Sequence, residues 1–277
     1  MRVALFQLNV SDDPVANLAD TRALIAKAAA GGAQFALTPE VTNCLSSSRA
    51  RQQEVLQRQE DDITLATLRK DAKALGIWIL IGSLALKTDD IDGRFSNRSF
   101  LLSPEGEIAA WYDKIHMFDV EVSPEEVYRE SDGYRPGRHA SVTQTPFGNV
   151  GLSVCYDLRF AYLYRALAHA GADILTVPAA FSPVTGAAHW EVLLRARAIE
   201  TGCFVLAPAQ TGTHPASRGK PRKTYGHSMV VAPWGEVLAD AGTEIGVTFV
   251  DLDMSAVSQA RKRVPALYHD RKFDGPR

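Results

Sequence analysis

The sequence predicts an α/β layered fold with mixed sheets. Segments with the period of a strand alternate with segments with the period of a helix along the whole chain, which is typical of sheets covered by helices. Two pairs of strand-like segments are joined by short turns, so antiparallel pairs are expected beside parallel ones. The chain has 277 residues, 46% of them hydrophobic, and no stretch resembles a linker. We therefore expect one domain over residues 1–277.

In the first half of the chain, periodicity predicts the helices and strands, and turn or glycine residues mark where they end. The first helix ends at the Gly31-Gly32 pair, the second ends at Gly76, and a Ser-Pro-Glu-Gly turn joins a hairpin. In order, the predicted elements are strand 2–9, helix 17–30, strand 35–37, helix 54–75, strand 77–86, and a hairpin of strands 97–102 and 108–112.

The second half continues the alternation after a buried strand that ends at a cysteine. Residues 121–139 and 211–223 are polar, contain prolines and have no sustained period, so both are predicted to be loops. The remaining predicted elements are strand 150–154, a helical segment that continues through Ala168, strand 173–178, helix 189–201, strand 203–209, a hairpin of strands 225–232 and 236–239, and strand 247–253.

The charge balance bears on the kind of partner. Lys and Arg total 30 and Asp and Glu total 32, for a net charge of −2, so the chain has no electrostatic footprint for nucleic acid or an anionic membrane. A small-molecule partner is expected instead. The apolar residues 3–6 are too few for a signal peptide, and no run approaches the length of a membrane span. We therefore expect a cytoplasmic protein.

The three cysteines suggest a reactive thiol and no cross-link. Cys44, Cys155 and Cys203 lie far apart without metal-ligand spacing, so neither a disulfide framework nor a metal site is predicted. Cys203 is expected to be core packing, and so is Cys44, although its position four residues after Glu40 leaves open an approach to the same pocket. Cys155 ends a buried strand where a polar turn and a helix begin, a position where nucleophiles are usually displayed and where the helix N-terminus favours the thiolate. A cysteine taken alone is more often a small buried core residue.

Three sequence motifs favour a nucleophilic role for Cys155 over a role in core packing. They are LTPE at residues 37–40, YDKIHMFD at residues 112–119 and GLSVCYDLRF at residues 151–160. Their types and order resemble the nitrilase superfamily, the carbon-nitrogen hydrolases. The resemblance covers the chain from Arg2 to about Phe273 and implies the four-layer α-β-β-α sandwich of that superfamily. Periodicity alone does not distinguish this fold from a doubly wound sheet.

The resemblance also implies a mechanism and its residues. Glu40, Lys114 and Cys155 match the Glu-Lys-Cys triad, which hydrolyses a carbon-nitrogen bond through a cysteine thioester without a cofactor or metal. Glu40 would act as base and then acid, and Lys114 would stabilise the oxyanion together with the backbone N–H of Tyr156. Glu130 matches a second glutamate, which is thought to orient the lysine. Without the resemblance, both glutamates could be solvated carboxylates and Lys114 a surface ion pair.

A further segment indicates the substrate class. TGAAHWE, at residues 185–191, resembles a motif shared by deaminated glutathione amidases and by ω-amidases that act on α-ketoglutaramate, with Ala187 in place of a proline. The surrounding sequence is most similar to the first group, which implies that deaminated glutathione is cleaved to α-ketoglutarate and cysteinylglycine. The expected substrate contacts are Thr185 as the preferred one, the cations Arg159 and Arg195, the walls Phe118 and Phe181, and His116.

Other functions stay open at this point. An ω-amidase is the nearest alternative, followed by another aliphatic amidase or carbamoylase. A catalytically inactive binding subunit would belong to a different class, although all three triad residues are intact. A Cys-His thioesterase on an unrelated fold would depend on a histidine instead of Lys114.

Two structural expectations complete the analysis. Asp157 and Arg159 are expected to bond to each other at the start of the helix and support the nucleophile turn. The resemblance implies a homodimer or a higher homo-oligomer that associates through the helical segments 160–170 and 189–201, and both segments carry more apolar surface than one packed face requires. Residues 264–273 could also cross to a partner.

Overall fold

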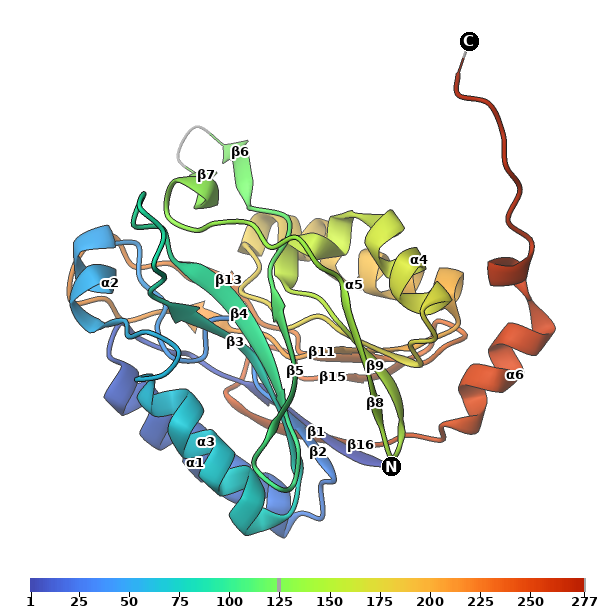
Figure 1. Cartoon of the computed structure of the whole chain (residues 1–277), viewed down its shortest axis with the longest axis horizontal. Coiled ribbons are helices and arrows are strands. Elements are labelled where there is room, and N and C mark those ends of the chain that lie inside the picture. The colour runs from blue at the N-terminus through green and yellow to red at the C-terminus, as the bar shows by residue number, and fades with distance from the viewer. Residues whose placement is uncertain (124–125, 277) are drawn as a thin grey trace.

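The computed structural model describes residues 1–123 and 126–276 and contains two six-stranded sheets packed face to face (Figure 1). The first sheet has the order β16-β1-β2-β3-β4-β5. Its strands are β1 (Arg2–Gln7), β2 (Phe35–Leu37), β3 (Trp78–Leu86), β4 (Ser96–Leu102), β5 (Ile108–Asp113) and β16 (Gly246–Asp251). The second sheet has the order β15-β14-β11-β10-β9-β8. Its strands are β8 (Ser141–Thr145), β9 (Gly148–Leu152), β10 (Ile174–Thr176), β11 (Phe204–Ala207), β14 (Met229–Val231) and β15 (Val237–Asp240).

Helices cover the outer face of each sheet. α1 (Pro14–Ala30) and α3 (Ile63–Leu75) pack against each other and on the first sheet, while α4 (Ala161–His169) and α5 (Pro183–Thr201) cover the second (Figure 1). α2 (Arg49–Val55) lies beside the sandwich, and α6 (Ser255–Arg263) and the C-terminal residues extend away from it (Figure 1). The predicted four-layer α-β-β-α sandwich, with both parallel and antiparallel strand pairs, is confirmed.

The core explains why the strands read as continuous apolar runs. In β1, Val3 and Leu5 pack toward the second sheet, whereas Ala4 and Phe6 belong to the layer beneath α1 and α3. All four side chains are fully buried. A strand covered on both faces loses the polar alternation of a half-exposed strand, so the sequence shows its length but not its sidedness.

Strand direction brings the functional motifs together. β1, β2 and β3 are parallel, and β5 has the same direction because β4 is antiparallel to both β3 and β5. Residues that follow β2 and β5 therefore lie at one edge of the first sheet. β9, β10 and β11 are also parallel, so residues that follow β9 and β10 share one edge of the second sheet.

Several predicted boundaries are wrong for local reasons. The predicted helix 54–75 is two helices, because the chain is extended at Leu56 and the Asp62 side chain caps a new helix by accepting from the Leu65 N–H. The predicted helix 189–201 begins earlier, at Pro183, a residue suited to the first turn. Strand β8 and helix α6 were not predicted.

The predicted loop 121–139 contains a hairpin. Strands β6 (Asp119–Ser123) and β7 (Glu126–Arg129) pair antiparallel, and a 3-10 turn, Glu130–Asp132, follows. Residues 124 and 125 of this segment lie outside the described residues. The hairpin projects beyond the sandwich (Figure 1). The hairpin does not pack into an apolar core, so its sequence can be acidic and contain a proline, as a loop's can.

The predicted loop 211–223 is bounded by a second small strand pair, β12 (Thr211–Thr213) and β13 (Lys223–Tyr225). His214 fixes the loop to the end of β1, since its Nδ1 is 2.7 Å from Val10 O and its Nε2 is 2.7 Å from Thr224 Oγ1. A carbonyl only accepts, so Nδ1 carries the proton and the neutral ring accepts at Nε2.

His214 makes a testable contribution to the pH dependence of stability. Burial lowers the pKa of His214 to about 4, against an ordinary 6.5, so between these values the unfolded chain binds the extra proton. The free energy of unfolding should therefore fall as the pH drops through this window, by up to about 1.4 kcal/mol per unit from this group. Urea denaturation at pH 7.0 and 5.0 tests this with His214→Gln, whose amide can form the same two bonds. In His214→Gln the free energy of unfolding should depend less steeply on pH than in the wild type. The exposed control His139→Gln should keep the pH dependence of the wild type.

No helix in the described part of the chain is both long and apolar enough to cross a membrane.

Candidate active site

A cavity of ≈ 270 Å³ lies where the carboxyl edges of the two sheets meet. Glu40 follows β2, Lys114 follows β5 and Cys155 follows β9, and all three side chains line the cavity. The β6–β7 hairpin and the turn after it close one side through Tyr128 and Glu130. Residues more than one hundred positions apart in the sequence therefore meet in one small space.

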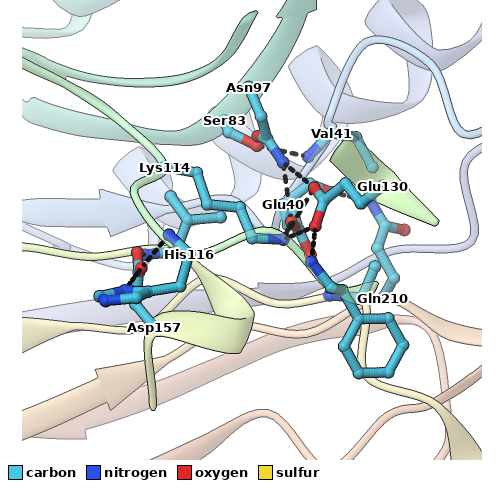
Figure 2. A network of polar contacts seen from close by, with 12 residues as sticks. Glu40, Val41, Ser83, Asn97, Lys114, His116, Glu130, Asp157 and Gln210 are labelled. Atoms are coloured by element: carbon cyan, nitrogen blue, oxygen red, sulfur yellow. Dashed lines mark hydrogen bonds and ion pairs between the residues drawn. The ribbon is translucent and has the colours of Figure 1, made fainter. Parts of the chain in front are cut away.

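Lys114 lies between two carboxylates (Figure 2). Its Nζ is 2.9 Å from Glu40 Oε1 and 2.8 Å from Glu130 Oε2. The side chain is only 2% exposed, so these two anions replace water as its partners. A buried cation without such partners would lose its proton, and the arrangement therefore keeps a fixed positive charge at the base of the cavity.

Glu40 is held from both sheets. Besides Lys114, the side chain accepts a hydrogen bond from Asn97 Nδ2 at 2.8 Å and from the Ala180 N–H at 2.9 Å. Gln210 Nε2 donates to the Glu40 carbonyl at 2.9 Å. Asn97 and Gln210 were not among the predicted site residues, because nothing in their local sequence marks them. Only the pairing of β4 with β5 places Asn97 beside Lys114, where its carbonyl accepts from the Lys114 N–H at 2.9 Å.

The charges of this cluster reinforce one another. Burial acts to raise the pKa of Glu40, but the charge and hydrogen bond of Lys114 and the charge of Arg222 outweigh it and leave the pKa lowered. Burial acts to lower the pKa of Lys114, and the two carboxylates raise it well above its ordinary value. Glu40 is therefore an ionised base and Lys114 an ammonium at neutral pH.

Cys155 has a strained backbone at the mouth of this cluster. Its φ is +50°, a left-handed conformation that few non-glycine residues adopt. The Cys155 N–H donates to Pro178 O at 2.9 Å, which ties the turn to the end of β10. Such strain persists only where the surroundings impose it, and here it presents the thiol to the cavity that Glu40 also lines.

The thiol is neutral, in contrast to the expectation that its thiolate would be favoured. Burial and the negative charge of Glu40 raise the pKa of Cys155 well above its ordinary value, and the opposing effect of Lys114 is smaller. The helical segment that begins at Cys155 is a short 3-10 turn, Cys155–Arg159, and it provides little dipole. A neutral thiol beside an ionised carboxylate is a proton donor with its acceptor in place.

Asp157 supports the nucleophile turn through partners other than the predicted Arg159. The buried carboxylate accepts from Tyr112 Oη at 2.7 Å, from the Val154 N–H at 2.9 Å and from the His116 N–H at 3.0 Å. His116 Nδ1 lies 2.7 Å from the same carboxylate (Figure 2). The turn is therefore fastened to the end of β5, the strand that Lys114 directly follows. Arg159 instead lies 3.4 Å from His189 Nδ1.

A family model described as Carbon-nitrogen hydrolase matches residues 2–262. The chain belongs to the carbon-nitrogen hydrolase family. A relative from Yersinia enterocolitica named Deaminated glutathione amidase is 40% identical over 270 residues, with 97% of this chain and 92% of that protein aligned.

Two solved structures are similar to this hydrolase. The NitFhit protein of C. elegans has a TM-score of 0.88 and 33% identity over 98% of this chain, which spans 65% of that longer chain. An amidase variant from Nesterenkonia sp. AN1, with a TM-score of 0.76 and 28% identity, covers 97% of this chain and 99% of its own. That structure shows the result of Michael addition of acrylamide at the active site cysteine. The predicted nitrilase-superfamily membership and amidase class are confirmed.

The remaining predicted site residues of this hydrolase divide into two groups. Tyr156, Phe118 and Phe181 line the cavity with the triad and Glu130. Thr185, Arg159, Arg195 and His116 do not. The Thr185 hydroxyl lies 3.5 Å from Ser182 O, and Arg195 Nε donates to Gly235 O. Their predicted contacts with substrate stay predictions.

The early start of α5, at Pro183, determines which residues of the segment after β10 line the cavity. Only residues 180–182 of the segment after β10 line the cavity, and TGAAHWE lies in the first turns of the helix. Ala187 is therefore an exposed helical residue and not part of a loop, and alanine suits that position. The absence of a proline at position 187 therefore does not loosen a loop.

Two further residues, Cys44 and Arg222, also line the cavity. Cys44 lines the cavity as well as packing in the core, and burial raises its pKa to about 12, so it stays a thiol. Arg222 was missed. It enters the cavity wall from the predicted loop 211–223, where an arginine reads as an ordinary surface charge.

Proposed function

We propose that this carbon-nitrogen hydrolase is an amidase of deaminated glutathione. The observation that carries the proposal is the 40% identity, over nearly the full length of both chains, with a relative of that name. The cavity adds a chemical reason. It combines a thiol, an ionised carboxylate and a buried ammonium for amide hydrolysis with an arginine that suits an acidic substrate.

In the proposed first half-reaction Glu40 accepts the proton of Cys155 as the sulfur attacks the γ-amide carbon. The carbonyl oxygen becomes anionic, and Lys114 and the Tyr156 N–H stabilise it. Tyr156 is the second residue of its 3-10 turn, where an N–H has no acceptor within the turn. Glu40 then gives its proton to the departing amine, cysteinylglycine, and an α-ketoglutaryl thioester remains on Cys155.

In the second half-reaction Glu40 takes a proton from water, whose oxygen attacks the thioester. The carbon-sulfur bond breaks, the thiol recovers its proton from Glu40, and α-ketoglutarate leaves. Glu130 acts in this scheme through Lys114, since its two oxygens lie 2.9 and 2.8 Å from Nζ and one of them also accepts from the Phe118 N–H. The carboxylate therefore fixes the ammonium where the oxyanion forms.

An ω-amidase acting on α-ketoglutaramate is the second candidate, because TGAAHWE resembles the motif of both groups. Release of α-ketoglutarate from each compound, measured over a range of concentrations, separates them. We expect kcat/KM to be at least about tenfold higher for deaminated glutathione, since differential binding of the larger leaving group favours it. A higher value for α-ketoglutaramate would assign the protein to the second group. Inactivity on both would contradict the proposed substrate.

A homodimer in a reducing compartment, the cytoplasm, is part of the same proposal. Tyr162 on α4 and Val192 on α5 are 67% and 68% exposed, and both helices lie on one outer face of the sandwich (Figure 1). The three cysteines are free thiols in the structure. Light scattering of the purified protein should give twice the chain mass of 30.2 kDa. A single-chain mass would contradict the dimer.

A further inference from the structure

Three cations line the cavity within the described residues, and they differ in their partners. Lys114 is paired with two carboxylates, and Arg129 is paired with Glu121 at the rim. Arg222 is the third. No carboxylate of residues 1–123 or 126–276 lies within ion-pair distance of Arg222, so this guanidinium faces the cavity without an anion.

The Arg222 guanidinium is held in place by two contacts, but one of its hydrogen-bond donors has no partner among the described residues. Arg222 Nη2 donates to Ala180 O at 2.8 Å, and its Cζ lies 5.5 Å from the centre of the Tyr128 ring. Its Nε is buried and has no hydrogen-bond acceptor in the described part of the protein. A buried donor without a partner is costly. The buried Arg197, by contrast, donates from Nε to Leu158 O and from Nη1 to Glu200.

The position of Arg222 relative to the reacting groups is fixed by one residue. Ala180 accepts from Arg222 through its carbonyl and donates from its N–H to Glu40 Oε2 at 2.9 Å. The guanidinium and the proposed base are thus bound to the same residue, Ala180. The loop that carries Arg222 is anchored by His214, whose Nδ1 lies 2.7 Å from Val10 O. Among the described residues of this loop, Arg222 is the only cation that lines the cavity.

We infer that Arg222 binds a carboxylate of the substrate and selects amides that carry an acid group. A guanidinium presents several N–H donors in a plane and binds a carboxylate through two of them at once. Such a carboxylate would satisfy the buried Nε and supply the anion that the other two cavity cations already have. The identity of the substrate rests on the proposed function, whereas selection for an acidic amide does not require deaminated glutathione.

A different role for Arg222 would be to balance the charge of Glu40, Lys114 and Glu130. Arg222 does contribute to lowering the pKa of Glu40. In that role its loss would slow the hydrolysis of every amide alike, because Glu40 acts on all of them. Selection by Arg222 affects acidic substrates alone, and this difference makes the two roles separable.

The test compares glutaramate with its neutral analogue pentanamide, and includes deaminated glutathione. In Arg222→Gln we expect kcat/KM to fall on the order of 100-fold for the two acidic amides and less than about threefold for pentanamide. Arg222→Lys should recover part of the loss, since the charge is kept and the two-point contact is not. Arg218→Gln is the matched control, because Arg218 lies in the same loop, is 59% exposed and pairs with Glu54. It should behave as the wild type.

A binding measurement makes the test independent of turnover. In a Cys155→Ala background, calorimetry with glutarate should show affinity weakened at least about tenfold by Arg222→Gln. Equal losses on acidic and neutral amides, or unchanged glutarate binding, would overturn the inference. If the wild type ignores deaminated glutathione but prefers glutaramate and loses that preference in Arg222→Gln, the proposed substrate fails and the inference stands. If it cleaves deaminated glutathione equally well without Arg222, the inference fails and the function stands.

Discussion

Cys155→Ala is expected to abolish hydrolysis of every amide that the enzyme accepts, with kcat reduced on the order of 10⁴-fold or more. The reason is covalent: no other described side chain in the cavity provides a nucleophile beside Glu40, since Cys44 is a thiol whose pKa burial raises to about 12. Product release measured at substrate concentrations far above KM isolates the chemical step. Mass spectrometry of the wild type during turnover should show an acyl group on Cys155.

The control for this variant is its fold. Alanine keeps the backbone conformation of the turn, because the φ of +50° at position 155 is imposed by the Pro178 contact and the Asp157 network and not by the thiol. Thermal unfolding should therefore match the wild type within a few degrees. Turnover retained by the variant would refute Cys155 as the nucleophile. A parallel Cys44→Ala variant should remain active.

Lys114→Met is expected to destabilise the protein as well as inactivate it. The substitution leaves Glu40 and Glu130 as two buried carboxylates without the ammonium that lies 2.9 and 2.8 Å from them. Breaking a buried ion pair in this way typically costs about 3–5 kcal/mol. Urea denaturation at neutral pH measures the loss, and Lys70→Met, an exposed lysine on α3, is the matched control and should change stability little.

The pH dependence of this loss has a definite sign. In the variant, burial and mutual repulsion would raise the carboxyl pKa values above those of the unfolded chain, so lower pH favours the folded state. In the wild type the pKa of Glu40 is lowered, so lower pH disfavours the folded state. The stability gap between the two proteins should therefore narrow as the pH falls from 7 toward 5. A gap that is constant or widens with falling pH would contradict a buried charge cluster.

The local sequence was sufficient where the signal itself is local. β1, β3 and the β4–β5 hairpin were predicted within one or two residues, because each strand contains a short apolar stretch bounded by polar or turn residues. The break between α2 and α3 was missed because helical spacing continues across it. The β6–β7 hairpin was missed because its strands are only five and four residues long and rich in acidic residues, so their alternation is too short to stand out from a polar loop.

The site shows the same division. Glu40, Lys114, Cys155 and Glu130 were found through the motifs around them, and the structure places all four in one cavity. Asn97, Gln210 and Arg222 carry no such motif, and each reaches the site only because strand pairing or the anchored β12–β13 loop brings it there. Polar residues of this kind are indistinguishable from surface residues until their neighbours in space are known.

By itself, the sequence determined the alternation of strands and helices, the family and the residues able to form a thioester. These follow from periodicity and from short motifs, in which the information lies within a few consecutive positions. Only the tertiary structure decided the charge state of those residues and which arginines line the cavity. Burial and Coulomb interactions depend on distances between groups such as Ala180, Arg222 and Glu40, which are far apart in the chain and adjacent in space.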